Sequence, residues 1–318
     1  MIRFEFGVED LARTRFAISP MLELVTGLRA LRDAGQAAMH VPWARDVMPV
    51  ARRLELATAF ALAPTTGFVP DFLTPPPSGP IASFEEELER IRAADVEQVR
   101  ANVRELLDQR RQSRELADLL ADPAAGLARL ADTLEAFWDE AFAEHWPRVR
   151  ALLDADIAHR AQRLTHGGPA ELFADLHPSV TWTDRGLSVE IYWSDDVALD
   201  GRGLLLVPSA MQWQRPACII DAPWQPTLVY PARGLALLWQ TGHSSHSALA
   251  RVLGQTRTML LEALDAPRST SDLATALGGV SRHLTALRDA GLATASRHRH
   301  SVLYARTALA DQLPTPRP

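Results

Sequence analysis

Apolar residues recur at helical spacing through most of the first half of the chain. Ser19-Pro20 offers an N-cap followed by proline at the first helical position, and Gly35 is expected to end the helix that follows. Its apolar face consists of Met21, Leu24, Val25, Leu28 and Leu31. Residues 63–80 contain six prolines and two glycines, so they are predicted to be an ordered loop or a hinge.

Further helices are predicted around residues 47–62, across 83–122, and from there to about Leu164. The tract from Ser83 begins with acidic residues, which are favourable at the positive end of a helix dipole. Asp122-Pro123 and Gly126 break this tract, and His166-Gly-Gly-Pro169 stops the last helix.

Alternating apolar and polar residues mark strands on both sides of this helical region. Ile2, Phe4 and Phe6 alternate with polar residues and predict a short opening strand. From about Leu176, short β-leaning runs cover residues 180–183, 187–193, 203–207, 217–221 and 228–230. Arg185-Gly186 and residues 200–203 are typical of hairpin-like connections. The fold class predicted is α+β, helical over residues 1–175, with a small antiparallel β region over 176–240.

The last fifth of the chain predicts three helices and a hairpin. The first helix closes at Pro267, and its apolar face consists of Leu249, Val252, Leu253, Leu260 and Leu264. Ser269 or Thr270 caps the second helix, and Asp272 nearly completes a capping box. The third helix buries Val280, Leu284 and Leu287, and Gly291 ends it as a left-handed C-cap. Two β-leaning segments, 292–297 and 301–306, then enclose a basic tip, Arg297-His-Arg-His300.

Helical spacing places six residues away from the buried stripe of the third helix: Ser281, Arg282, Thr285, Ala286, Arg288 and Asp289. Outward hydroxyl and guanidinium groups suit base edges and phosphates. His283 lies at the edge of the stripe, so a packing role and a phosphate contact both remain open. The N-terminus of the second helix, at Thr270 and Ser271, offers free N–H groups that suit phosphate.

Charge is distributed unevenly along the chain. The whole chain has 33 basic and 39 acidic residues and a net charge of −6. From Leu249 onward there are nine arginines and five acidic residues, a local charge of +4, so the part before it carries −10. A basic terminal module on an acidic body is expected when only one domain meets phosphates. Every basic residue is arginine, for which codon bias is the favoured explanation.

Several other kinds of chemistry find little support. The single cysteine, Cys218, excludes a disulfide framework and a cysteine-rich metal site, and it fits a reducing cytoplasm. No nucleophile elbow or acid/base arrangement is evident, so neither catalysis nor a cofactor is expected. His243-Ser-Ser-His246 lacks further ligands, and Asp195, Asp196 and Asp200 are interpreted as turn residues rather than a cation site. Without a signal peptide or a membrane span, we expect a soluble cytoplasmic protein.

Five tryptophans in the β-rich region leave two interpretations open, a core packed with aromatic residues and an aromatic-lined ligand pocket. They are Trp182, Trp193, Trp213, Trp224 and Trp239.

Four strings in the terminal region resemble the arsenical-repressor (ArsR-type) winged helix-turn-helix regulators. They are Leu253-Gly-Gln-Thr-Arg257, Thr270-Ser-Asp-Leu-Ala274, Val280-Ser-Arg-His-Leu-Thr-Ala-Leu-Arg-Asp-Ala-Gly-Leu292 and Val302-Leu-Tyr304. Upstream phrases are similar to an uncharacterised domain attached to such regulators: Ile18-Ser-Pro-Met, His40-Val-Pro-Trp43, Gly201-Arg-Gly-Leu-Leu-Leu-Val-Pro208 and Pro223-Trp-Gln-Pro-Thr-Leu-Val-Tyr230.

The resemblance implies a transcriptional regulator, expected to be a repressor, in which a winged helix over residues 247–313 binds operator DNA. Residues 1–240 would sense a small-molecule effector of unknown identity or form a homodimer. Combining pattern and resemblance, the expected DNA-facing residues are Thr270, Ser271, Ser281, Arg282, His283, Thr285, Arg288, Arg297, His298, Arg299 and His300.

The chain departs from the family pattern in two places. The second helix has no cysteines, which argues against thiolate metal sensing there. Leu277-Gly-Gly-Val280 is shorter than the family's connection between the second and third helices. Either a tight turn or one continuous helix fits this segment, and the glycines favour the turn. A fused helix would favour the alternative function, a protein-interaction module that no longer reads DNA.

Overall fold

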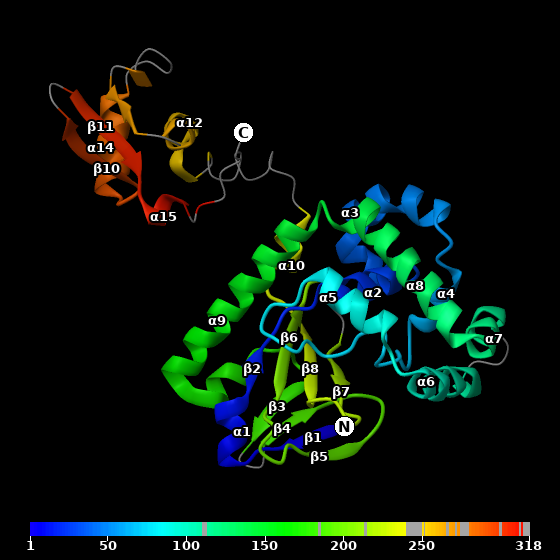
Figure 1. Ribbon diagram of the computed structural model, residues 1–318. Helices are drawn as coiled ribbons and strands as arrows, with labels where there is room; N and C mark the ends of the chain where they lie inside the picture. The colour runs from blue at the N-terminus through cyan, green and yellow to red at the C-terminus, as the bar shows by residue number, and fades with distance from the viewer. Residues whose placement is uncertain are drawn as a thin grey trace. The chain divides into compact units, whose positions relative to one another are not determined.

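The computed structural model describes residues 1–109, 113–183, 186–212, 215–239, 250, 252–264, 267–270, 272–273, 280–298, 301–311 and 313. The chain divides into two compact units, Met1–Trp239 and Gln240–Pro318 (Figure 1). Each unit has a hydrophobic core of its own. The fold is therefore mixed α and β, with helices and small sheets in both units.

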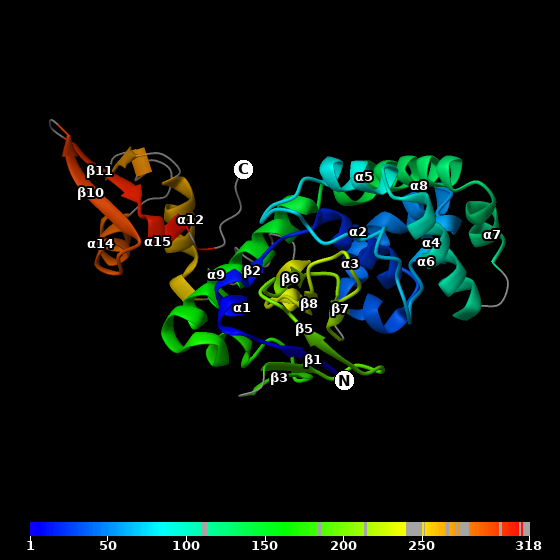
Figure 2. The ribbon, with the colours of Figure 1, turned by 60° about the horizontal axis from the view of Figure 1, so that its bottom comes forward.

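Unit 1 contains two four-stranded sheets. In Figures 1 and 2, the helices from α2 (Pro20–Ala30) to α8 (Pro123–Phe137) gather on one side of the unit and the long helix α9 (Trp146–Phe173) lies on the other, with the sheets between them. The first sheet has the order β3-β4-β1-β5, formed by Val180–Thr183, Gly186–Val189, Ile2–Glu5 and Asp195–Ala198. The second has the order β2-β6-β8-β7, formed by Arg15–Phe16, Leu205–Ser209, Thr227–Pro231 and Ala217–Ile219.

The predicted opening strand is confirmed, because Ile2 and Phe4 of β1 are buried while Arg3 and Glu5 are exposed. The expectation of an antiparallel region confined to residues 176–240 is wrong. Strands β1 and β2 come from the N-terminus, β1 pairs in parallel with β5, and β6 pairs in parallel with both β2 and β8. Parallel neighbours need a crossover connection, and short-range alternation carries no information about such a partner.

The turn at residues 200–203 is present, with Arg202 N–H donating to the Leu199 carbonyl at 2.9 Å. It is no hairpin, however, because the strands on its two sides, β5 and β6, belong to different sheets. The first sheet packs its inner face on the end of α9 (Trp146–Phe173), where Phe173 stacks on Trp182 with ring centroids 5.0 Å apart.

The helices of unit 1 before α9 are more numerous than predicted, because the tract predicted over residues 83–122 forms three helices and the helix predicted around 47–62 is divided between two. Their bounds are α1 Val8–Arg13, α2 Pro20–Ala30, α3 Ala34–Arg53, α4 Ala57–Leu62, α5 Phe84–Arg92, α6 Val96–Gln109, α7 Arg114–Ala121, α8 Pro123–Phe137 and the π-helical turn η1 Trp138–Phe142. Ser19 caps α2 as predicted, but α2 ends before Gly35, which lies in α3. In the structure, residues 63–80 form a loop without helix or strand, and this loop contains a turn at 71–73. The kink at Gly167 and Gly168 confirms the expected interruption of α9.

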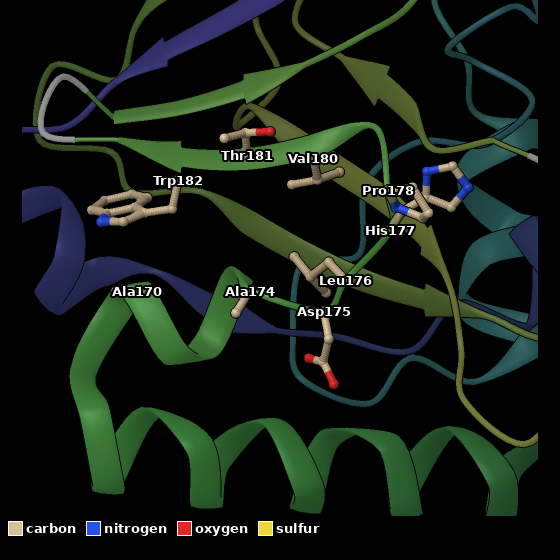
Figure 3. A pocket seen from close by; sticks show the side chains of 9 residues that line it. All are labelled: Ala170, Ala174, Asp175, Leu176, His177, Pro178, Val180, Thr181 and Trp182. Carbon is tan, nitrogen blue, oxygen red and sulfur yellow. The ribbon is translucent and has the colours of Figure 1, made fainter.

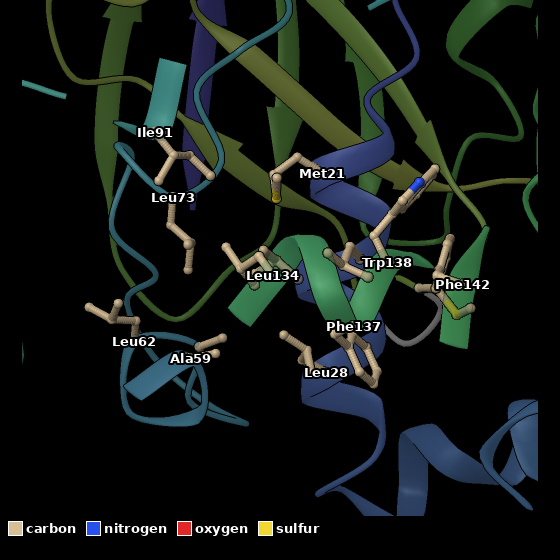
Figure 4. Packing of buried hydrophobic residues seen from close by; sticks show 14 of the residues in the cluster. Met21, Leu28, Ala59, Leu62, Leu73, Ile91, Leu134, Phe137, Trp138 and Phe142 are labelled. Atoms are coloured by element: carbon tan, nitrogen blue, oxygen red, sulfur yellow. The ribbon is translucent and has the colours of Figure 1, made fainter. Parts of the chain in front are cut away.

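The helical part of unit 1 encloses the largest core of the protein. Figure 4 shows side chains from α2, α4, α8 and η1 meeting in it, among them Leu28, Leu62, Leu134 and Phe142. The apolar faces of these helices follow the predicted three-and-four spacing, and burial of this apolar area is the main stabilising contribution to the unit.

Two buried carboxyl groups connect α2 to its neighbours. Glu87 of α5 accepts hydrogen bonds from Met21 N–H at 2.8 Å and from the Ser19 hydroxyl at 3.0 Å. Glu23 accepts from the N–H groups of Ala210 and Met211, each at 3.0 Å. Burial raises the pKa of each carboxyl group to about 7. Two buried carboxyl groups therefore hold α2 to α5 and to the backbone at residues 210 and 211.

A buried arginine joins the middle of α9 to the loop after it. Arg160 donates to the Asp175 carboxylate through Nη1, and to the Asp175 carbonyl oxygen through Nη2 at 3.2 Å. Its guanidinium lies 5.7 Å from the centre of the Tyr230 ring, and the Tyr230 hydroxyl donates to Asp156 at 2.8 Å. Arg160 is fully buried, so these contacts take the place of water for its two Nη groups, while its Nε has no hydrogen-bond partner among the described residues.

Unit 2 has a compact arrangement of helices on a three-stranded sheet. Its elements are α12 Gln255–Ala263, β9 Arg268–Ser269, α14 Ser281–Asp289, β10 Ala293–His298, β11 Ser301–Arg306 and α15 Ala308–Asp311. The sheet has the order β10-β11-β9, and α14 packs against both α12 and β10. The buried stripe of Val280, Leu284 and Leu287 contributes to its core, as predicted.

One expectation about the first helix of unit 2 is wrong. Val252, predicted to lie on its buried face, is 81% exposed. Gly254 has a φ of +85° and separates residues 252–253 from α12. This break changes the direction of the side chains before it, so the spacing across residue 254 no longer predicts a common face. None of the helices in the described part of the chain is long and apolar enough to cross a membrane.

Candidate nucleic-acid interface

Helix α14 is fixed by its buried stripe and by a well-formed C-terminus. Gly291, with a φ of +71°, donates its N–H to the Arg288 carbonyl, and Leu292 N–H donates to the Leu287 carbonyl, each at 2.9 Å. These are the two hydrogen bonds of a Schellman motif, which needs a left-handed residue at the glycine. The predicted C-cap is therefore confirmed, and β10 begins immediately after it.

The outward face of α14 carries five exposed residues of the predicted set, Ser281, Arg282, Thr285, Arg288 and Asp289. The Thr285 hydroxyl donates to the Ser281 carbonyl at 3.0 Å, within the helix. Arg282 makes no hydrogen bond or ion pair with another residue in the described part of the chain. This face thus presents a guanidinium group that is available for an external acceptor.

Two further residues of α14 are less available. Arg288 forms an ion pair with Asp289, with Nη2 and Oδ1 3.1 Å apart. This pairing neutralises much of the positive charge that Arg288 was expected to offer. His283 is half-buried, and its Nδ1 has no hydrogen-bond partner among the described residues. The structure therefore places His283 at the edge of the core and leaves both of its predicted roles open.

The start of the second helix is capped by its own side chains. Asp272 N–H donates to the Ser269 hydroxyl at 3.2 Å, and the Asp272 carboxylate accepts from the Ser269 hydroxyl and N–H at 2.7 and 3.2 Å. These hydrogen bonds hold the pKa of Asp272 below its usual value. The expected reciprocal cap is confirmed, and it places a carboxylate beside the N–H groups that a phosphate would need. Thr270 follows, half-buried, and Ser271 lies outside the described residues.

The hairpin β10–β11 pairs in the register Ala293↔Arg306 to His298↔Ser301. Because side chains alternate between the faces of a strand, Arg297 shares a face with buried Ala293. This is the face that packs on the helices of unit 2, and Arg297 extends it toward the tip, where it is exposed. His298 ends β10, while Arg299 and His300 lie outside the described residues.

The sequence patterns did not predict two features of this region. The short strand β9 pairs Arg268 with Tyr304 and adds an exposed arginine to the sheet. Val302, opposite Arg297, leaves 41% of its surface exposed near the tip. A two-residue strand has no periodicity to detect, so only the tertiary pairing reveals Arg268.

The connection at 277–279, on which the choice between turn and fused helix depends, lies outside the described residues.

A cavity of about 650 Å³ lies in unit 1 between β3 and the end of α9. Figure 3 shows Val180 and Trp182 on β3 opposite Ala170 in the last turn of α9 and Ala174 just after its end. The volume falls within the range typical of small-molecule sites. Asp175 lines the cavity but is already bound to Arg160, so its carboxylate is engaged before any ligand arrives.

The tryptophans mostly pack in cores. Trp239 is buried in the larger core, Trp193 packs against the core of the first sheet, and Trp182 both stacks on Phe173 and lines the cavity. Trp224 contacts the Arg90 guanidinium, with 5.7 Å to its ring, and Trp213 lies outside the described residues.

In the described part of the chain, no group of three or more His, Cys, Asp or Glu side chains could hold a metal ion. Burial raises the pKa of the Cys218 thiol to about 12, so it is protonated at neutral pH. His243 and His246 lie outside the described residues.

Comparison with known proteins gives one match, to a family of unknown function (DUF5937) over residues 93–236. The matched segment lies within unit 1 and includes the cavity and the buried Arg160. No curated protein and no solved structure matches the chain.

Proposed function

We propose that this protein is a transcriptional regulator of ArsR type, a repressor that binds operator DNA through a winged helix-turn-helix in unit 2. In this proposal α14 is the recognition helix and the hairpin β10–β11 is the wing. The observation that carries it is the exposed face of α14, where Arg282 has no intramolecular partner in the described part of the chain.

The geometry of unit 2 supports this assignment. Core packing holds α14 by Leu284 and Leu287, which leaves Ser281, Arg282 and Thr285 on the outward face. A helix of this kind fits the major groove, where arginine reads guanine through two parallel hydrogen bonds. We expect Arg297 on the hairpin to contact the phosphate backbone beside it, and phosphate contacts set the register of such a complex.

The charge distribution supports the same assignment. The +4 charge from Leu249 onward and the −10 charge before it favour phosphate contact through unit 2 alone. Asp272 and Asp289 reduce the positive charge locally, so we expect moderate non-specific affinity and a larger share of binding energy from base contacts.

Unit 1 would supply dimerisation and response to an effector. A dimer would read two half-sites about one helical turn apart. The cavity between β3 and α9 is the place we assign to a small-molecule effector. Binding there would change DNA affinity by a coupling free energy that is typically about 1–3 kcal/mol. No chemical step is required of such a regulator.

The test is fluorescence anisotropy of the full-length protein on DNA from upstream of its own coding sequence, with unrelated duplex as competitor. We expect competitor-resistant binding, tighter than non-specific binding by about 10³-fold or more. Weak binding that the competitor removes would overturn the proposal and favour the alternative, a protein-interaction module with a degenerate helix-turn-helix.

A further inference from the structure

We infer that Thr285 reads thymine in the operator through its γ-methyl group, and that its hydroxyl takes no part in base recognition. This inference rests on the proposed function, because it assigns a base preference to one residue of the proposed recognition helix. The inferred contact is apolar and joins the γ-methyl group of Thr285 to the 5-methyl group of thymine.

The first observation is the internal hydrogen bond of Thr285. Its Oγ1 donates to the carbonyl oxygen of Ser281, one turn earlier, at 3.0 Å. A threonine hydroxyl has a single proton, so it cannot donate to a base while this bond is intact. The remaining group on the β-carbon is the methyl, and the residue as a whole is exposed. An external ligand therefore meets the methyl group and a hydroxyl oxygen that can only accept.

The second observation is the position of Thr285 on α14. It lies one turn after Ser281 and three residues after Arg282, on the face opposite buried Leu284 and Leu287. Residues three and four apart on a helix are neighbours on its surface. If Arg282 reads a guanine in the major groove, Thr285 faces the edge of a nearby base pair. Thymine is the base that offers a methyl group there.

Neighbouring charges favour an apolar contact at this position. The next turn carries Asp289, whose carboxylate is held by Arg288 at 3.1 Å. The Arg288 guanidinium is held by this carboxylate, which leaves Arg282 as the unpaired arginine of α14 among the described residues. Thr285 thus lies between the guanidinium of Arg282 and a neutralised pair, where a methyl–methyl contact is the interaction it can add.

Two conservative substitutions separate the methyl group from the hydroxyl. Thr285→Ser keeps the hydroxyl and its hydrogen bond but removes the methyl. Thr285→Val keeps a methyl and removes the hydroxyl, and the Ser281 carbonyl still has its helical partner. Because the position is exposed, both variants are expected to fold, which circular dichroism and the melting temperature would check.

The experiment begins with selection of binding sites by the full-length protein from a duplex library with a randomised core. Each thymine of the selected site is then replaced singly by deoxyuridine, which lacks only the 5-methyl group, and Kd is measured by anisotropy. For the wild type we expect about fourfold weaker binding at one thymine of each half-site, the effect of losing about one buried methyl group. Thr285→Val should retain this sensitivity, and Thr285→Ser should lose it.

The outcomes separate this inference from the proposed function. A selection that returns no sequence preference overturns both. A selected site whose affinity is unchanged by every deoxyuridine overturns the inference alone. Equal deoxyuridine sensitivity in wild type and Thr285→Ser would assign the methyl contact to another side chain. Loss of base preference in Thr285→Val but not in Thr285→Ser would show that the hydroxyl oxygen does the reading, as an acceptor.

Discussion

Trp239 donates its indole Nε1–H to Nδ1 of His40 at 2.8 Å, which joins two residues 199 positions apart in the sequence. Trp239 also stacks on Trp43, with ring centroids 6.1 Å apart, and His145 meets it edge-on at 5.6 Å. Trp239 is the last residue of unit 1, and His40 lies at the kink in α3. The end of unit 1 is therefore anchored to α3 by a buried polar contact surrounded by aromatic rings.

Replacement of Trp239 by Phe should destabilise the protein by about 1–3 kcal/mol, because the buried Nδ1 of His40 would lose its donor. Equilibrium urea unfolding of the full-length protein, followed by circular dichroism, measures this loss. Tyr192→Phe, at a residue that is 76% exposed, serves as the control and should change stability little. Equal stability of Trp239→Phe and wild type would show that the hydrogen bond contributes nothing.

The buried carboxyl of Glu87 predicts a specific pH dependence. Its pKa is about 7 in the folded protein against an ordinary value of 4.5 for an exposed glutamate, so the folded state binds the proton more tightly. Stability from this group is fully present below pH 4.5 and is lost as pH rises through 7. Glu87→Gln should therefore gain stability relative to wild type between pH 5 and 8, by on the order of 3 kcal/mol.

The measurement is urea unfolding of Glu87→Gln and wild type across that pH range. The free energies of unfolding of the two proteins are subtracted at each pH, so that groups common to both cancel. One such group is His40: burial lowers its pKa to about 4, so its contribution to stability falls as pH drops below 6.5, the opposite direction to that of Glu87. Glu85→Gln, an exposed neighbour on the same turn, is the control. A difference between Glu87→Gln and wild type that stays constant from pH 5 to 8 would contradict the prediction.

Arg160 should be far more important for stability than a surface arginine on the same helix. Arg160→Met removes the partner of Asp175 and the cation near buried Asp156, and breaking a buried pair of this kind typically costs about 3–5 kcal/mol. Arg150→Met breaks only the surface pair with Asp154 and should cost less than about 1 kcal/mol. Thermal and urea unfolding of the two variants would show the contrast, and similar losses would refute it.

The two exposed arginines of the proposed interface should differ in their effect on DNA binding. Arg282→Ala should weaken operator binding by about 1–3 kcal/mol and relax the preference at one base pair, because it removes a contact to a base edge. Arg297→Ala should weaken specific and non-specific DNA alike and lower the salt slope by about 1, because it removes a phosphate contact. Fluorescence anisotropy at several salt concentrations tests both predictions. Unchanged DNA affinity in both variants would contradict the proposed docking of unit 2 on DNA.

Local features of this protein were predictable from the sequence. The cap of Ser269 and Asp272, the C-terminus of α14 at Gly291 and the buried stripe with Leu284 and Leu287 all depend on residues within one or two turns. Their signals are strong because the responsible groups are neighbours in the chain. The outward set on α14 could be identified in the same way, since exposure on a single helix follows from its periodicity.

Long-range relationships were not predictable. The parallel pairing of β1 with β5 and the separation of β5 from β6 into different sheets depend on where distant segments meet. Two local features were not predictable either: the exposure of Val252, which follows from the backbone break at Gly254, and the pairing of Arg288 with Asp289, which side-chain conformation decides.

The sequence by itself thus determined the helical faces, the caps, the hairpin and the candidate face of α14, because periodicity and capping are local interactions. Only the tertiary structure decided which strands pair and which groups Arg160 and Glu87 contact in the core. Those properties arise from burial and from hydrogen-bond partners that a one-dimensional pattern does not specify.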